Sequence, residues 1–381
     1  MNSQEIFYKR LEEALNERRD QNRFRSTQTR PSGVLDLCAN DYLGMRRHPL
    51  VYEKGLAAAQ TYGAGSGASP LLGGFHPCHE ALLEQLKVWK QKPHGMLFNT
   101  GFMANQALLK RLPGPDDLIL CDRLIHHSMI QALDRSQTRF KRYEHLKLDA
   151  LENELKKAAG DYQTLFVVSE SVFSMDGDYP DLKRLAQLRK EYGFIWILDE
   201  AHGTGVYGAK GAGLAEEMGV ADSVDILIGT LGKAIGSMGA YVLSQRKGVI
   251  DYLSNHAGEY IYSTFLPPFA VGAASAAIEL IQKASPDRQR LRERAVEVRQ
   301  ELTRIGYEVN PFDSPIIPVM IGDSEKAVEL SRRFLEENIL IGAVRPPTVP
   351  VGTERLRLSL HTGLSDTDIQ RMIDLFSKWK A

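Results

Sequence analysis

Short apolar runs alternate with longer amphipathic stretches between about residues 46 and 270, and this alternation constrains the fold more than any other feature of the chain. Most of the runs are unbroken hydrophobic blocks, which are typical of strands buried on both faces of a mostly parallel sheet. The stretches between them have the helical spacing expected of crossover helices. A large α/β domain is therefore predicted. The runs are residues 96–98, 118–121, 165–168, 194–198, 226–228 and 240–243, and the helical stretches are 79–90, 147–159 and 181–192.

The pattern changes after residue 270, where a smaller α+β domain is expected. One apolar stripe predicts a long helix and consists of Leu291, Ala295, Val298, Leu302 and Ile305. Runs at 316–321, 340–344 and 355–360 predict strands, and 366–379 predicts a closing amphipathic helix. In the run 355–360, leucines alternate with Arg355, Arg357 and Ser359, which predicts a sheet with one apolar and one polar face.

Ahead of the large domain, residues 5–20 have apolar side chains at helical spacing among charges, which predicts a surface helix. An arginine-rich polar connector over residues 18–32 leads to a short segment at 34–39. We therefore divide the chain into an N-terminal helix and connector (1–45), the large domain (46–270) and the small C-terminal domain (271–381). The 381 residues are enough for such a division, because domains average about 150 residues.

The charge balance and the cysteines limit the class of protein. A net charge of −1 argues against a nucleic-acid-binding protein, because counterion release needs a concentrated basic surface. Three widely spaced cysteines form no disulfide framework and fit a reducing compartment. The first residues are charged and lack an apolar run, so no signal peptide is expected. The most apolar stretch, 266–278, is too short to span a bilayer, so a cytoplasmic protein is predicted.

Common nucleotide and metal motifs fail on inspection. The glycine-rich segment 63–67 lacks the third glycine of a dinucleotide loop, since position 68 is Ala68. The loop at Lys233 is not a Walker A motif, because positions 227 and 234 are Leu227 and Ala234. The D-E-A-H sequence at 199–202 therefore does not indicate an ATPase. Histidines at 76, 79, 126 and 127 lack zinc-site spacing, so no metal is expected. No G-x-S-x-G occurs, which argues against a serine nucleophile.

Two strand ends carry residues of opposite charge. Lys233 lies a few residues beyond the run 226–228, among glycine, alanine and threonine. A lysine in such surroundings has a lowered pKa and can act as an amine nucleophile. Asp199 directly follows the run 194–198, and a carboxylate there is costly to bury unless it meets a cation. A protonated heteroaromatic nitrogen would be such a cation.

Three further strand ends carry polar groups. His126 follows the run 118–121, and Ser174 lies in the loop after 165–168. The turn at Gly101 begins a helix whose exposed N–H groups could hold a phosphate. Each feature alone is explained by a structural role, such as a helix cap. Ligands of open α/β sheets bind at the carboxyl ends of the strands, and together these groups supply what pyridoxal phosphate requires.

Several motifs, in this order, make the chain resemble the α-oxoamine synthases, a branch of the fold-type I pyridoxal phosphate enzymes. They span nearly the whole chain and are the segments at 40–44, 101–102, 122–126, 173–178, 199–205 and 230–233. The resemblance implies a mostly parallel large-domain sheet with helices on both faces, a smaller α+β domain, and a cytoplasmic homodimer with shared active sites. Pyridoxal 5'-phosphate is the implied cofactor, bound by the large domain.

The resemblance also implies roles for the catalytic residues. Lys233 would hold the cofactor as an imine and later move the α-proton of the substrate. Asp199 would pair with the pyridinium nitrogen and keep it protonated. His126 would stack on the cofactor ring, and His202 would hydrogen-bond its phenolic oxygen.

The remaining site residues of the family bind phosphate or substrate. Those implied to hold the cofactor, through its phosphate and nearby polar atoms, are Gly101, Phe102, Ser174 and Thr230, with Ser263 and Thr264 reaching the phosphate of the partner subunit. The amino-acid carboxylate would bind to Arg357, on the polar face of its strand. Arg25 and Thr348 would contact the acyl thioester, and Asn40 and His126 would line the substrate site.

Within the family, the segment 345–350 with Gly352, Thr353 and the strand at 355–357 is most similar to members that join L-alanine to a pimeloyl thioester in biotin synthesis. The thioester carrier, CoA or a carrier protein, stays open, and the segment 69–77 departs from the family pattern. Glycine with acetyl-CoA, glycine with succinyl-CoA and serine with a long acyl chain remain alternatives. A non-catalytic pyridoxal phosphate-binding subunit is a further alternative of a different class, which predicts a missing lysine or acid.

Overall fold

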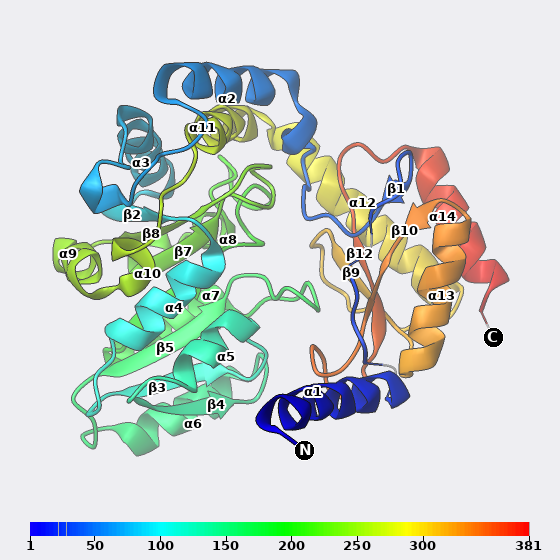
Figure 1. Cartoon of the computed structure of the whole chain (residues 1–381), viewed down its shortest axis with the longest axis horizontal. Helices are drawn as coiled ribbons and strands as arrows, with labels where there is room; N and C mark the ends of the chain where they lie inside the picture. The colour runs from blue at the N-terminus through cyan, green and yellow to red at the C-terminus, as the bar shows by residue number, and fades with distance from the viewer. Residues whose placement is uncertain (22, 28, 381) are drawn as a thin grey trace.

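The computed structural model describes every residue of the chain except 22, 28 and 381. Its two main parts, one built on a seven-stranded sheet and the other on a three-stranded sheet, lie side by side (Figure 1). Helix α1 (Ser3–Asp20) lies along the lower side of the view and buries none of its side chains. Among the described residues, no helix is both long and apolar enough to cross a membrane.

The large sheet has the strand order β2-β8-β7-β6-β5-β3-β4, and every strand except β8 runs in one direction. The predicted mostly parallel sheet is therefore confirmed. Its buried central strands are the apolar runs of the sequence. The strands are β2 (His94–Phe98), β3 (Leu118–Asp122), β4 (Arg139–Tyr143), β5 (Leu165–Glu170), β6 (Ile195–Asp199), β7 (Ile226–Thr230) and β8 (Ala240–Ser244).

Helices cover both faces of this sheet, because successive side chains of each strand point to opposite sides. On β3, Leu118 and Leu120 enter one hydrophobic core, whereas Ile119 and Cys121 enter the other. The first core also takes residues from α3 (Pro77–Lys90), α6 (Leu148–Ala158), α7 (Leu182–Tyr192) and α11 (Pro268–Lys283). The second takes residues from α4 (Gly101–Arg111), α5 (His127–Leu133) and α9 (Lys247–His256). Short helices α8 (Leu214–Glu217) and α10 (Gly258–Ile261) lie in the connections.

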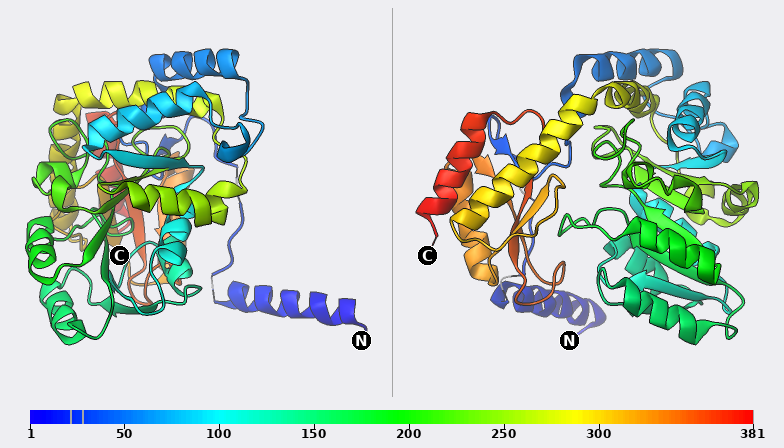
Figure 2. Two further views of the ribbon diagram at one scale, coloured as in Figure 1. Left: turned by 90° about the vertical axis from the view of Figure 1, so that its left-hand side faces the viewer. Right: turned by 180° about the vertical axis from the view of Figure 1, so that it is seen from behind.

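The small part is the predicted α+β unit. Its antiparallel sheet has the order β11-β12-β9, and the long predicted helix is α12, which extends toward the large part in the view from behind (Figure 2). The chain start joins this part, because β1 (Leu35–Asp36) pairs with β10 (Ile339–Leu340). The other elements are β9 (Ile316–Met320), β11 (Gly342–Val344), β12 (Arg355–Ser359), α12 (Ser285–Arg304), α13 (Ser324–Glu336) and α14 (Asp366–Lys378).

The polar face predicted for the small sheet is buried. The polar side chains of β12 do not face solvent, since all five residues of this strand are buried. The large part covers that face: Arg355 pairs with Asp176, and Arg357 donates to the main-chain oxygen of Ser174. Alternation along the strand is real, but its polar side faces the neighbouring part of the protein, which the pattern alone could not reveal.

Other differences have local causes. Strand β4 was not predicted, because it is an edge strand with mostly exposed, charged residues.

The domain limits at 45/46 and 270/271 stay a prediction. The second limit falls inside α11, which packs against α2 (Pro49–Tyr62) and α3. The connector predicted over 18–32 includes residues 22 and 28, which lie outside the described residues.

The complete burial of β3 predicts the cost of weakening the core around it. Leu120 is fully buried, so Leu120→Ala should lower the free energy of unfolding by about 2–5 kcal/mol through lost contacts and a cavity. Leu72→Ala is the matched control, because Leu72 is 82% exposed and should cost less than about 0.5 kcal/mol. Urea denaturation measures both, and equal losses would contradict this assignment of the core.

Candidate active site

The site lies where the carboxyl ends of parallel strands meet at one edge of the large sheet. Glu170 ends β5, Asp199 ends β6 and Thr230 ends β7, and these three strands are neighbours. Their register pairs Glu170 directly with Asp199. The loops that leave these ends carry the polar residues singled out in the sequence, as expected for an α/β sheet.

Lys233 lies in the loop after β7, and its amine contacts a histidine. Its Nζ is 2.7 Å from Nε2 of His202, whose Nδ1 is 2.6 Å from the hydroxyl of Tyr42. Tyr42 and His202 are buried, and the same hydroxyl reaches Oδ1 of Asn40 at 3.3 Å. One connected row of polar groups therefore runs from the lysine amine to Asn40.

Asp199 is 6% exposed, and its carboxylate is held from two sides. Oδ1 accepts the N–H of Ala201 at 2.8 Å, and Oδ2 accepts the side-chain amide of Asn105 at 3.2 Å. Lys233 and Asp199 interact electrostatically, so the two charged residues predicted for one ligand do lie at one site.

His126 forms the N-cap of α5. Its Nδ1 lies 2.7 Å from the hydroxyl of Ser128, and its own N–H donates to Oε1 of Glu170 at 2.5 Å. The hydroxyl of Ser128 also accepts the amide of Asn105. Because Asn105 donates to Asp199 as well, His126 and Asp199 share one hydrogen-bond network.

Arg357 reaches the site from β12 of the small part. Its guanidinium donates from Nε to the main-chain oxygen of Ser174 at 2.6 Å and from Nη2 to Oδ1 of Asn40 at 3.1 Å. Nη1 donates to the hydroxyl of Ser359 at 2.8 Å. The arginine is 8% exposed and affects the pKa of both Lys233 and His202, so it belongs to the same electrostatic cluster.

The start of α4 lies beside the end of β7. A Cβ added to Gly101 would meet only Thr230, at 4.0 Å, so space is open in front of this turn. Thr100 caps the helix by accepting the N–H of Met103, while the N–H groups of Gly101 and Phe102 have no partner within the helix. Asn99, just before the turn, donates to the hydroxyl of Ser263 and to the main-chain oxygen of Thr264 in the same chain.

Arg25 and Thr348 form a separate pair. Nη2 of Arg25 donates to the hydroxyl of Thr348 at 2.7 Å, across 323 positions of the chain. Among the described residues, neither of them hydrogen-bonds to the group around Lys233. The structure therefore joins the two residues predicted for the acyl substrate to each other, at the loop that follows β11.

Burial shifts the pKa values at this site in opposite directions. It lowers the pKa of Lys233 to about 8, against the raising effect of Asp199 and Glu170. Burial, with the nearby Lys233, lowers the pKa of His126 and moves that of His202 well below its usual range. Burial next to Asp199 moves the pKa of Glu170 well above the ordinary value. Both histidines are therefore neutral near pH 7, and the lysine can give up its proton at mild pH.

The residues present fit pyridoxal phosphate. The cofactor needs an amine for its aldehyde, an acid for its ring nitrogen and donors for its phosphate. Lys233, Asp199 and the open turn at Gly101 supply these groups at one sheet edge. The fold and this site define a fold-type I pyridoxal phosphate enzyme.

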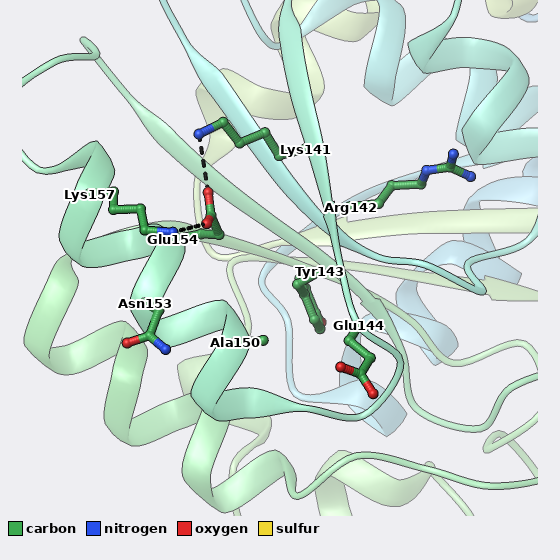
Figure 3. A pocket seen from close by; sticks show the side chains of 8 residues that line it. All are labelled: Lys141, Arg142, Tyr143, Glu144, Ala150, Asn153, Glu154 and Lys157. Atoms are coloured by element: carbon green, nitrogen blue, oxygen red, sulfur yellow. Dashed lines mark hydrogen bonds and ion pairs between the residues drawn. The ribbon is translucent and has the colours of Figure 1, made fainter.

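A hollow elsewhere on the surface contains none of the predicted site residues. It has a volume of about 540 Å³ and lies over β4 and α6, where Glu154 pairs with Lys141 and Lys157 (Figure 3). These ion pairs neutralise part of the charge of the side chains that line the hollow. Its lining consists of Lys141, Arg142, Tyr143, Glu144, Ala150, Asn153, Glu154 and Lys157.

The sequence reasoning missed three residues of the site. Tyr42 lies in the segment 40–44 and Asn105 on the helix that begins at Gly101, but no role was given to either residue. Glu170 is the last residue of β5, two positions after the apolar run 165–168. This position was the available signal, since Asp199 was found in the same way. The contact of Tyr42 with His202 spans 160 positions and leaves no local pattern.

Comparison with known proteins gives the same class. Residues 32–376 match the sequence model of the family "Aminotransferase class I and II". The 8-amino-7-oxononanoate synthase of Geobacter sulfurreducens is 40% identical over 344 residues, covering 89% of this chain and 87% of the relative. That of Aeromonas hydrophila is also 40% identical, covering 89% of this chain and 84% of the relative.

Solved structures agree with this. Serine palmitoyltransferase of Sphingomonas wittichii has a TM-score of 0.86 and 30% identity, with 91% of this chain and 86% of the other covered. The 8-amino-7-oxononanoate synthase of Francisella tularensis has a TM-score of 0.79 and 27% identity, with 91% and 98% covered. The chain therefore belongs to the class I and II aminotransferase family, in the branch of the 8-amino-7-oxononanoate synthases.

The lowered pKa of Lys233 predicts its reactivity. A lysine is acylated only when its amine is neutral, so the rate of acylation follows the neutral fraction. In the cofactor-free protein the rate of labelling of Lys233 by acetic anhydride should be half-maximal near pH 8, measured by mass spectrometry of its peptide. The control is an unfolded peptide of residues 228–238, whose lysine should need a pH of about 10.4. Labelling of both at the same pH would contradict the effect of burial.

Proposed function

We propose that this protein catalyses the decarboxylative condensation of L-alanine with pimeloyl-CoA, or the pimeloyl thioester of a carrier protein, to 8-amino-7-oxononanoate. The other products are CO₂ and the free thiol of the carrier, and the reaction is a step of biotin biosynthesis. The observation that carries the proposal is the contact of the Lys233 amine with His202, close to Asp199, in a chain 40% identical to enzymes of that name. Pyridoxal phosphate, when bound, takes up the electrons of the bond that breaks at the α-carbon of alanine.

Lys233 is proposed as the residue that holds the cofactor and then moves a proton. Its lowered pKa leaves the amine able to accept the α-proton near pH 8. The 2.7 Å contact with His202 fixes the direction in which the amine points. After the carboxylate has left as CO₂, the same amine can return a proton to the product.

Asp199 is proposed to hold the proton on the cofactor's ring nitrogen. Its carboxylate is buried and already accepts two hydrogen bonds, which fix its orientation. His126 is proposed to stack on the ring, with its imidazole fixed by Ser128, and His202 to donate to the phenolic oxygen. For that donation His202 needs its proton on Nε2. If the Tyr42 hydroxyl donates to Nδ1, it keeps Nδ1 unprotonated and the proton on Nε2.

Arg357 is proposed to bind the carboxylate of alanine. Its guanidinium is held by Ser174, Ser359 and Asn40, so it presents a fixed pair of donors. A fixed carboxylate orients the amino acid and so decides which bond at the α-carbon breaks. Asn40 lines the same place, and Arg25 with Thr348 is proposed to contact the acyl thioester.

The phosphate is proposed to lie against the turn at Gly101. The first N–H groups of α4, those of Gly101 and Phe102, would donate to the phosphate. The helix dipole also favours an anion at this end of the helix. Thr230 borders the same space. Ser174 is proposed to contact polar atoms of the cofactor. The large part of the chain, proposed as a domain over 46–270, would thus bind the whole cofactor.

The product assay with a Lys233→Ala variant tests the proposal. Wild-type protein given alanine and pimeloyl-CoA should release CO₂ and form 8-amino-7-oxononanoate, and borohydride should attach the cofactor to Lys233. Lys233→Ala should bind the cofactor only noncovalently and lose at least about 10³-fold in kcat, since the proton carrier is gone. Product only from serine or glycine with another acyl-CoA would replace the proposed substrates, and normal turnover of the variant would exclude Lys233.

Arg357→Lys tests the carboxylate site. A lysine keeps the charge but loses the bidentate geometry, so we expect KM for alanine to rise at least about 10-fold, with a smaller change in the KM for pimeloyl-CoA. Steady-state kinetics with each substrate varied gives both values. An unchanged KM for alanine would remove Arg357 from this role.

We further propose a cytoplasmic homodimer with shared sites. Support comes from three free cysteines and from large apolar side chains exposed beside the site, namely Phe102, Met238 and Tyr262. Ser263 and Thr264, next to Tyr262, are proposed to reach the partner's phosphate. Tyr262→Glu should shift the sedimentation coefficient from that of a dimer toward that of a monomer, whereas Val88→Glu, at an equally exposed position on α3, should not. A wild-type monomer at micromolar concentration would contradict the dimer.

A further inference from the structure

His145 lies outside the site and outside every motif that the function uses, yet it connects two of the site's loops. It is located between β4 and α6, and its side chain is 20% exposed. Its Nδ1 is 2.8 Å from Oδ1 of Asp122, and its Nε2 is 3.0 Å from Oδ2 of Asp178. The ring meets Phe173 edge-on, at 4.6 Å between the centroids.

Each of the two carboxylates begins or ends a loop that carries a site residue. Asp122 ends β3 four residues before His126, and it also accepts the N–H groups of Leu124 and Leu146. Asp178 closes the turn that holds Ser174, since its main-chain oxygen accepts the N–H of Phe173 at 2.9 Å. The imidazole is therefore placed between the loop of His126 and the loop of Ser174.

The charges make this connection a strong one. Burial alone would lower the pKa of His145, but hydrogen bonds to Asp122 and Asp178 raise it to about 10. The ring is thus an imidazolium at neutral pH, with both N–H groups donating to a carboxylate, and such charge-assisted bonds are about twice as strong as neutral ones. Asp176 is a further titratable group that acts on Asp178.

The effect of this link extends to the substrate side. Ser174, in the loop that Asp178 closes, accepts the hydrogen bond of Arg357 through its main-chain oxygen. His126, on the other loop, is proposed to stack on the cofactor ring. A small shift of either loop would therefore change the geometry at which cofactor and alanine are held, and misplacements of about 1 Å can cost about 100-fold in rate.

We propose that His145 is a positioning residue, which as a half-buried imidazolium between Asp122 and Asp178 fixes the loops of His126 and Ser174 relative to each other. It touches neither cofactor nor substrate. Its role in turnover rests on the proposed function, but the ionic link itself does not. A purely structural role would lower stability and leave the geometry of the folded site unchanged.

The first experiment uses wild-type protein and needs no substrate. In histidine-labelled holoenzyme, ¹⁵N NMR should show a protonated His145 ring at pH 7.5, with both nitrogens bearing hydrogen, that loses its charge only near pH 10. His145→Gln assigns the signal, and Asp178→Asn, which keeps one partner, should lower the pKa. A neutral His145 ring at pH 7.5 would overturn the proposal, even if the product assay succeeds.

The second experiment measures the site in folded variants. In His145→Gln we expect altered visible circular dichroism of the bound cofactor, and a KM for alanine raised about 10-fold or more as Arg357 loses its fixed acceptor. Asp178→Asn should give a smaller change in the same direction, and it replaces His145→Gln if that variant does not fold. His256→Gln, on the distant helix α9, is the matched control. Wild-type dichroism and KM in folded variants would overturn the proposal.

Discussion

A buried carboxylate and a partly buried amine at one sheet edge are the constraint on which the rest of the site depends. Asp199 ends β6, and Lys233 lies in the loop after the neighbouring parallel strand β7, close enough for Asp199 to raise the pKa of the lysine. Neither group would be stable in an apolar interior alone, because an unpaired buried charge is costly. A cationic ring nitrogen and an aldehyde, in one molecule, satisfy both at once.

The small part of the chain completes the site by covering it. Arg357 bridges the two parts, since it donates to Ser174 of the large part and to Asn40 near the chain start. The polar face of β12 is therefore buried against the large part, where its arginines find their partners. Arg355 adds an ion pair with Asp176 at the same boundary. The proposed carboxylate site and the contact between the two parts depend on the same strand.

Much of this could be read from the sequence, and the limits have physical causes. Lys233 and Asp199 follow unbroken apolar runs, and such runs predict parallel strands whose ends converge. Arg357 was found on its strand, but its burial was not, because alternation shows two faces without showing what covers the polar one. Tyr42 and His145 had no local signal, because only the fold brings them to their partners. The partner of Tyr42 lies 160 positions away, and those of His145 lie 23 and 33 positions away.

The most direct test of the central claim is the protonation of the cofactor's ring nitrogen. Holoenzyme prepared with ring-¹⁵N pyridoxal phosphate can be examined by NMR, with Asp199→Asn as the comparison. The account predicts a protonated nitrogen in the wild type across neutral pH, and loss of that proton when the carboxylate is replaced by an amide. An unprotonated nitrogen in the wild type, or the same spectrum in both proteins, would contradict it.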